Sequence, residues 1–79
     1  MLSNFSKPKL LIDVKGFLCP IPALRARKAL NEIAVGDVLA VEATDPKTKK
    51  DIPLLCTEQN VTYLECIEHD HIIIHLIQK

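Results

Sequence analysis

Apolar and polar residues along the chain form blocks whose spacing predicts alternating strands and helices. Residues 9–14 are a short apolar run that ends just before Gly16, as a buried strand does. From residue 23 to about residue 33 the apolar positions recur at helical spacing, which predicts an amphipathic helix. The apolar stripe of this helix consists of Ala23, Ala26, Ala29, Leu30 and Ile33.

The next apolar block, residues 38–43, predicts a second strand after a turn at Gly36 and Asp37. A strand, a helix and a strand within about 35 residues form a βαβ unit, in which the strands are parallel and the crossover is right-handed. A second helix is expected from Asp51 to about Gln59, with Asp51 as its cap and Pro53 in its first turn.

Two β-rich runs, residues 61–68 and 72–77, flank His69-Asp70-His71 and predict an antiparallel hairpin. The element order βαβαββ then gives a four-stranded mixed sheet with both helices on one face. The expected fold class is an α/β (α+β) two-layer sandwich. Residues 9–79 form its single domain, after a flexible tail at residues 1–8.

The length of 79 residues allows one small hydrophobic core but no second domain and no large internal pocket, so chemistry must take place at the surface. The formal net charge is zero, but residues 1–50 hold nine Lys or Arg against five Asp or Glu, and residues 51–79 hold one against five. Since no apolar run approaches the ~18 residues of a membrane span, we expect a cytoplasmic protein without a membrane partner.

One segment has a distinctive chemistry, because Gly16-Phe17-Leu18-Cys19-Pro20-Ile21-Pro22 sets a thiol between a turn glycine and two prolines. Such prolines fit the first turn of a helix, where amides lack intrahelical partners, so we expect Cys19 to be the N-cap and the N–H of Ile21 to point at its sulfur. The helix macrodipole would lower the pKa of the thiol and stabilise a persulfide anion. The competing interpretation is a small hydrophobic residue that happens to cap a helix.

The other cysteines and the histidines suggest no further site. An odd number of cysteines without C-x-x-C spacing fits reduced thiols, and we expect Cys56 and Cys66 to be buried beside apolar neighbours. His69 and His71 lie in the hairpin turn and, with His75, lack zinc-finger spacing, so solvated histidines explain them better than a metal does. We predict neither a metal nor a cofactor.

Several short motifs occur together at consistent spacing: Asp13-x-x-Gly16-x-x-Cys19-Pro20-x-Pro22, then Gly36-Asp37, Asp45-Pro46 and Asp51-Ile52-Pro53-x-x-Cys56. In this combination residues 9–79 resemble the TusA, or SirA-like, family of small sulfur carriers. The resemblance implies that Cys19 accepts sulfane sulfur as a persulfide and relays it. It also implies that Asp45 and Lys50 lie beside this cysteine.

The resemblance implies partners as well. The sulfur donor would be a cysteine desulfurase or a rhodanese-like protein, and the acceptor a downstream sulfur-relay protein, with tRNA thiolation, molybdenum cofactor maturation and sulfur oxidation as destinations in relatives. Two residues depart from the family pattern. Lys50 replaces the usual arginine, which weakens any bidentate role, and Ile21 replaces a polar or acidic residue between the prolines, where it is expected to be exposed beside the thiol.

Two other function classes stay open. A protein- or RNA-binding regulatory module would use the basic side chains without sulfur chemistry, although zero net charge argues against autonomous nucleic-acid binding. In a carrier the same side chains are candidates for docking an acidic partner, while the lysine run at residues 47–50 fits a solvated loop equally well. These side chains are Arg25, Arg27, Lys28, Lys47, Lys49 and Lys50. A thiol–disulfide oxidoreductase would need Cys56 or Cys66 within bonding reach of Cys19.

Overall fold

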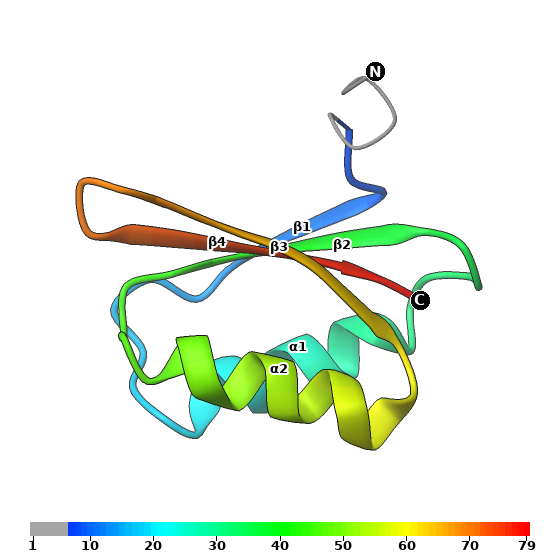
Figure 1. Cartoon of the computed structure of the whole chain (residues 1–79), viewed down its shortest axis with the longest axis horizontal. Helices are drawn as coiled ribbons and strands as arrows, with labels where there is room; N and C mark the ends of the chain where they lie inside the picture. Colours follow the sequence, from blue (N-terminus) through cyan, green and yellow to red (C-terminus); the bar gives the residue numbers. More distant parts are fainter. Residues whose placement is uncertain (1–6) are drawn as a thin grey trace.

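Four strands form one mixed sheet, and two helices cover one of its faces (Figure 1). The computed structural model describes residues 7–79, so most of the predicted N-terminal tail lies outside the described residues. The strand order is β1-β2-β4-β3, with β1 and β2 parallel and the other neighbours antiparallel. In chain order the elements are β1 (Leu10–Asp13), α1 (Ile21–Leu30), β2 (Val38–Ala43), α2 (Thr48–Gln59), β3 (Thr62–His69) and β4 (Ile72–Gln78). The predicted two-layer α/β sandwich is confirmed.

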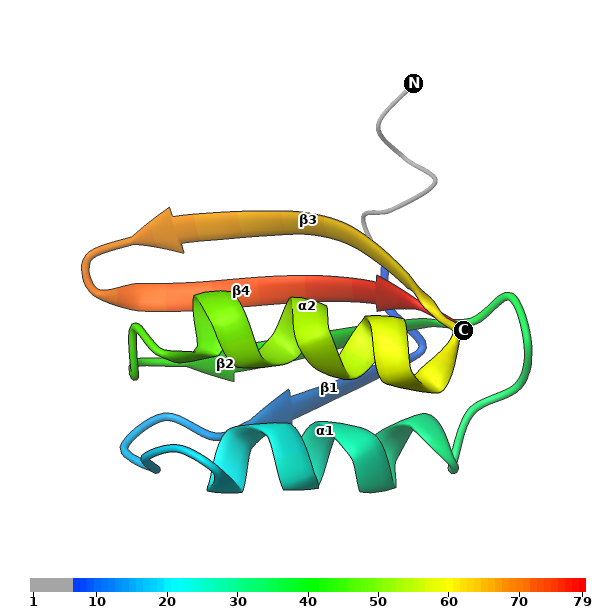
Figure 2. The ribbon, with the colours of Figure 1, turned by 60° about the horizontal axis from the view of Figure 1, so that its bottom comes forward.

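The core lies between the sheet and the two helices, which run side by side in the same direction (Figure 2). Because side chains alternate along a strand, Leu39, Val41 and Ala43 of β2 face the helices, while Val38 and Ala40 face the other side of the sheet. From the helices, Ala26, Ala29 and Leu30 of α1 are buried, and α2 adds Ile52, Leu55 and Cys56. α1 ends at Leu30 and not at about Ile33 as predicted, but Ile33 is still buried after the helix end. No helix within residues 7–79 is long and apolar enough to cross a membrane.

The second helix begins three residues earlier than predicted. Asp45 and Thr48 form a turn ahead of Asp51, in which the Thr48 hydroxyl donates to the Asp45 carbonyl (2.8 Å) and the Lys47 amide donates to Asp45 Oδ1 (3.0 Å). This turn satisfies groups that the start of a helix leaves unpaired. Asp51 therefore lies within the first turn of α2 instead of capping it, and Pro53 lies inside the helix.

The hairpin between β3 and β4 turns at Asp70 and His71, whose φ angles are +50° and +68°. Two consecutive residues in this region make a tight turn whose twist suits a hairpin. His69 belongs to β3 and not to the loop. The predicted antiparallel pairing is confirmed, with one bulge between Tyr63 and Glu65.

Both ends of the described chain lie at one end of the sheet. The Lys9 amide donates to the Val38 carbonyl (2.8 Å) at the start of β2, and Val38 pairs with Gln78 near the end of β4. The loop that follows β1 and carries Cys19 lies at the opposite end, where β2 also finishes (Figure 1).

Candidate functional site

Cys19 lies in the loop that connects β1 to α1, at the carboxyl end of two parallel strands. The loop is fixed at its start, because Asp13 Oδ1 accepts the Lys15 amide (3.0 Å) and the Gly16 amide donates to Thr44 Oγ1 (2.9 Å). Gly16 has φ +86°, a conformation that side chains disfavour, which explains the glycine at this turn. Cys19 itself is exposed to solvent.

The start of α1 differs from the prediction that Cys19 is its N-cap. Pro20 occupies the N-cap position, Ile21 is the first helical residue and Pro22 the second. The Ile21 amide donates to the Leu18 carbonyl (2.9 Å), so it does not point at the sulfur as expected. Both prolines do fall at the helix start, where an absent N–H costs little. Ile21 is exposed, as predicted, at 37% of its surface.

Asp45 holds the backbone of the cysteine. It follows β2, the neighbour of β1, and its Oδ2 accepts the Cys19 amide at 2.8 Å while its Oδ1 accepts the Lys47 amide. These two backbone hydrogen bonds, first that from Lys47 and then that from Cys19, lower the pKa of the Asp45 carboxyl. The structure thus places Asp45 beside Cys19, where the family resemblance implied it.

A buried chain of hydrogen bonds connects the Asp45 turn to β4 and β3. The Thr48 hydroxyl donates to the Asp45 carbonyl, so its oxygen is free to accept from Nε2 of His75 (2.9 Å). Nδ1 of His75 then accepts from the Tyr63 hydroxyl (2.7 Å), which assigns the proton of the neutral ring to Nε2. His75 is fully buried, and burial, followed by the charge of Lys49, lowers its pKa to about 4. The expectation of a solvated histidine is therefore wrong for His75.

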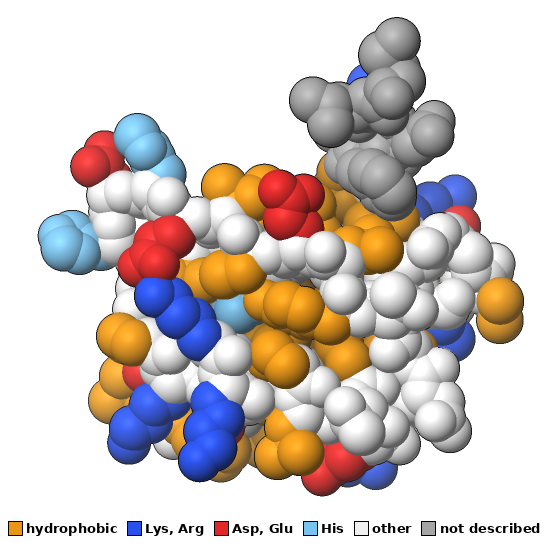
Figure 3. Space-filling model, in the orientation of Figure 1, with side chains coloured by type: hydrophobic (Ala, Val, Ile, Leu, Met, Phe, Trp, Pro, Cys, Tyr) orange, Lys and Arg blue, Asp and Glu red, His pale blue; other side chains and the backbone are white. Residues whose placement is uncertain are grey.

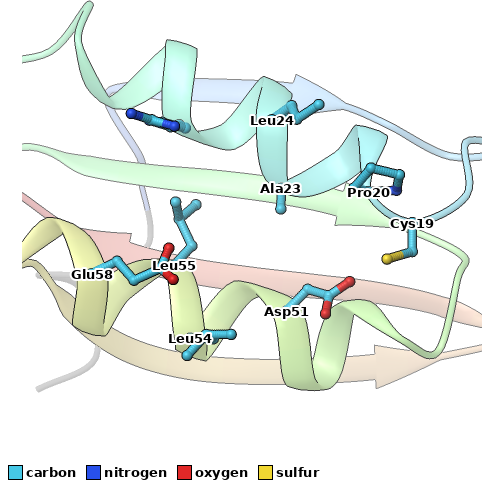
Figure 4. Close-up of a pocket in the computed structure, with 9 residues that line it drawn as sticks. Cys19, Pro20, Ala23, Leu24, Asp51, Leu54, Leu55 and Glu58 are labelled. Carbon is cyan, nitrogen blue, oxygen red and sulfur yellow. The ribbon is translucent and has the colours of Figure 1, made fainter.

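A groove of about 220 Å³ runs between α1 and α2 and begins at Cys19 (Figure 4). We call it the Cys19 groove. It is mainly apolar, with charged side chains near its two ends. From α1 and the residues before it, the lining consists of Cys19, Pro20, Ala23, Leu24 and Arg27, and from α2 it consists of Asp51, Leu54, Leu55 and Glu58. Leu24 and Leu54 are each 53% exposed, so the groove is open along its length.

Asp51 faces Cys19 across the mouth of this groove, and in Figure 4 the sulfur and the carboxylate point toward each other. A hydrogen bond with the Asp51 carboxylate raises the pKa of the Cys19 thiol; burial of the sulfur adds to this, and the charge of Lys47 opposes it. The prediction of a lowered pKa is therefore wrong. The reason is that Cys19 precedes Pro20, the N-cap residue of α1, and that the Asp51 carboxylate lies beside its sulfur.

The basic side chains do not form one surface. Arg27 lines the Cys19 groove, and Lys47 lies close enough to lower the pKa of Cys19. Lys49 pairs with Glu68 of β3. Lys50 is exposed and is not part of the groove lining, so the cation that acts on Cys19 is Lys47 and not Lys50 as expected. Basic side chains gather over the start of α2 beside exposed apolar ones (Figure 3).

The remaining basic residues of the predicted docking set lie elsewhere. The Arg25 guanidinium stacks over the ring of Phe17, 4.5 Å from its centre, and Arg25 and Lys28 line a second, smaller hollow on another side of α1. That hollow shares no lining residue with the Cys19 groove. Only part of the predicted docking set is therefore near the thiol.

The other thiols differ from each other. Cys56 is buried, as predicted, and burial raises its pKa to about 11. Cys66, however, is exposed on the edge strand β3, so the prediction of burial is wrong there. All three cysteines are free thiols. Within residues 7–79 no group of three His, Cys, Asp or Glu is arranged to hold a metal ion.

Asp51, Leu24 and Leu54 also belong to the site but were not predicted from the sequence. Their spacing carried a signal. On α2 the groove residues fall at positions 51, 54, 55 and 58, and on α1 at 23, 24 and 27, which is the spacing of one helical face. What the sequence did not reveal is that these two faces lie opposite each other, because that depends on how the helices pack on the sheet.

Comparison with known proteins gives a consistent result. Residues 11–79 match the family model described as Sulfurtransferase TusA. A candidate sulfur carrier protein of Neisseria meningitidis serogroup A is 39% identical over 67 residues, which are 85% of this chain and 90% of the relative. The sulfur carrier protein TusA of Pseudomonas entomophila is 47% identical over 45 residues, 57% of this chain and 56% of the relative.

A solved structure agrees with the fold. The crystal structure of a SirA-like protein from Desulfitobacterium hafniense matches with a TM-score of 0.79 and 30% sequence identity, and the match covers 87% of this chain and 95% of that one. A further relative, the candidate sulfur carrier YrkI of Bacillus subtilis, is 36% identical over 87% of this chain and 92% of its own length.

Proposed function

The chain belongs to the TusA family of sulfurtransferases, and from this membership we propose that it carries sulfane sulfur as a persulfide on Cys19 and relays it to an acceptor protein. The observation that carries the proposal is the setting of Cys19. Its sulfur is exposed at the mouth of a groove, while its backbone amide is held by Asp45 at 2.8 Å. A reacting atom held in this way is accessible to a partner and kept in place.

The transfer has two steps. In loading, the Cys19 thiolate attacks the terminal sulfur of a donor cysteine persulfide; the new bond joins Cys19 Sγ to that sulfur, and the donor leaves as a thiolate. In release, the thiolate of an acceptor cysteine attacks the terminal sulfur now on Cys19, which leaves as a thiolate. Both steps exchange one sulfur–sulfur bond for another, so neither requires an external oxidant or reductant.

The partners follow from this chemistry. The donor is a protein that presents a cysteine persulfide, such as a cysteine desulfurase or a rhodanese-like protein, and the acceptor is a sulfur-relay protein, with tRNA thiolation as the proposed destination. The cytoplasm suits this exchange, because thiols stay reduced there. Arg27 lines the Cys19 groove and Lys47 acts on the Cys19 thiol, so these two basic residues are the proposed docking contacts. Lys49, already paired with Glu68, is a weaker candidate.

The test is intact-protein mass spectrometry after incubation with a cysteine desulfurase and cysteine. The wild type should gain the mass of one sulfur atom, and a reductant should reverse the gain. Cys19→Ala should gain nothing. Cys66→Ala is the matched control, since it removes an exposed thiol outside the groove, and it should load like the wild type. A gain that persists in Cys19→Ala would contradict the site assignment, and no gain in the wild type with several donors would favour a binding module instead.

A further inference from the structure

We propose that the Asp51 carboxylate, which faces the Cys19 sulfur, weakens the binding of sulfur at Cys19 and thereby favours its release to an acceptor. This inference rests on the proposed function. Neither the family description nor the names of the relatives assign a role to Asp51.

The geometry brings the two groups together from different elements. Cys19 precedes α1, while Asp51 lies in the first turn of α2 and is half-buried. Both line the mouth of the Cys19 groove, and the sulfur and carboxylate point toward each other in Figure 4. The thiol and the carboxylate share a hydrogen bond. Because Cys19 is exposed, the interaction between the two groups is that of charges at contact distance in water.

The other charged groups around Cys19 do not cancel this effect. Asp45 adds a second carboxylate from the loop after β2, and only Lys47, at the start of α2, acts in the opposite direction. Arg27 of α1 and Glu58 of α2 line the same groove, but neither affects the pKa of Cys19. The net effect of these charged groups is to raise the pKa of the Cys19 thiol, and Asp51 contributes most to this increase.

This arrangement affects the empty and the loaded carrier differently. The loading reaction is Cys19–SH + donor–S–S⁻ → Cys19–S–S⁻ + donor–SH. One sulfur–sulfur bond forms at Cys19, one breaks at the donor, and the proton of Cys19 ends on the donor sulfur. The empty carrier presents a neutral thiol that donates a hydrogen bond to Asp51. A persulfide is a stronger acid than its parent thiol, so the loaded carrier presents an anion to the same carboxylate.

Like charges repel, so Asp51 raises the free energy of the loaded carrier relative to the empty one. The carrier therefore binds its sulfur less tightly than an isolated cysteine would. Loading still proceeds when the donor supply is high, and release to an acceptor becomes more favourable. Such a bias suits a protein that passes sulfur on and does not store it.

The first experiment needs no sulfur donor. The rate at which iodoacetamide alkylates Cys19 is measured against pH in a Cys66→Ala background, in which Cys19 is the only exposed thiol. Below pH 8, Asp51→Asn should react about fivefold faster than the parent, the factor expected for like charges at contact distance in water. Asp51→Glu, which keeps the charge, should react more slowly than Asp51→Asn. Glu32→Gln, which removes an exposed charge outside the Cys19 groove, should react at the parent rate. Melting curves verify that each variant is folded.

The second experiment measures the partition of sulfur. Persulfide-loaded wild type is mixed with empty, ¹⁵N-labelled Asp51→Asn, and the two are resolved by mass at equilibrium. Sulfur should accumulate about fivefold on the variant, and should divide equally when Glu32→Gln takes its place. Equal division with Asp51→Asn, or an unchanged alkylation profile, would overturn the role of Asp51 and leave the proposed function intact. Failure of the wild type to load at all would overturn both.

Discussion

Acidification from pH 7 to pH 5 should destabilise the folded protein by about 2 kcal/mol through His75 alone. The imidazole is fully buried, and its folded-state pKa is about 4, against the ordinary 6.5 that it regains on unfolding. As pH falls below 6.5, the unfolded chain binds a proton that the folded protein does not bind. Stability is therefore complete above pH 6.5 and is lost as pH falls toward 4, by about 3 kcal/mol over the whole interval.

The structure explains why the folded ring resists the proton. Nδ1, which would have to take it, already accepts from the Tyr63 hydroxyl, and Nε2 is engaged with Thr48. Burial adds the larger cost, and the positive charge of Lys49 adds a smaller one. His69, at the end of β3, and His71, in the hairpin turn, are both exposed and lie outside this buried network.

The assay is urea unfolding followed by circular dichroism, at half-unit steps from pH 8 to pH 5. With an m-value of about 1 kcal/mol/M, the midpoint should fall by about 2 M urea between pH 7 and pH 5. His75→Phe should be less stable at every pH, because it strands the hydroxyls of Tyr63 and Thr48, but its midpoint should be nearly independent of pH. His71→Ala, the control, should keep the full dependence. An equal pH dependence in wild type and His75→Phe would refute the reasoning.

The structure supports three further predictions. Asp45→Ala removes the acceptor of two backbone amides, and should lower the free energy of unfolding by about 2 kcal/mol in urea titrations and slow sulfur loading by mass spectrometry. Ile52→Ala should cost about 2–5 kcal/mol in the same titration, against less than ~1 kcal/mol for the exposed Leu54→Ala on the same helix; similar losses would contradict the packing. Native-state alkylation should modify Cys19 and Cys66 but reach Cys56 only in urea, and prompt labelling of Cys56 would contradict its burial.

Much of the fold could be predicted from the sequence, because its local signals agree with one another. β2 has the predicted bounds, since its apolar run is closed by Gly36-Asp37 on one side and by Asp45-Pro46 on the other. The order of elements, the parallel pair and the hairpin follow from the same patterns. The order of strands in the sheet was not predicted, because it depends on which edge the hairpin joins.

The helix starts were harder to predict, because several residues compete for the same role. Asp51 followed by Ile52-Pro53 has the composition of a helix start, yet the turn made by Asp45 and Thr48 satisfies the backbone earlier and begins α2 there. At α1 the Ile21 amide bonds to Leu18 instead of facing the sulfur. Each error shifted a boundary by one to three residues and thereby changed the expected surroundings of Cys19.

Of the site, Cys19 and Asp45 were predicted from the sequence, but the groove beside them was not. Cys19 and Asp45 follow adjacent parallel strands, so sequence order alone places them at one edge of the sheet. Asp51 and the groove depend on the packing of two helices and had no comparable signal. The burial of His75, in contrast, could have been predicted, since strand alternation puts it on the inner face of β4 with Ile73 and Ile77. Its place near a turn rich in histidine obscured that pattern.

The placement of the chain ends has a consequence for how this domain can be joined to other proteins. Lys9 and Lys79 lie at the end of the sheet opposite Cys19. A linker, an affinity tag or a solid support attached at the C-terminus would therefore leave the sulfur of Cys19 unobstructed. On a domain attached in this way, the end of the sheet that carries Cys19 would point away from the point of attachment.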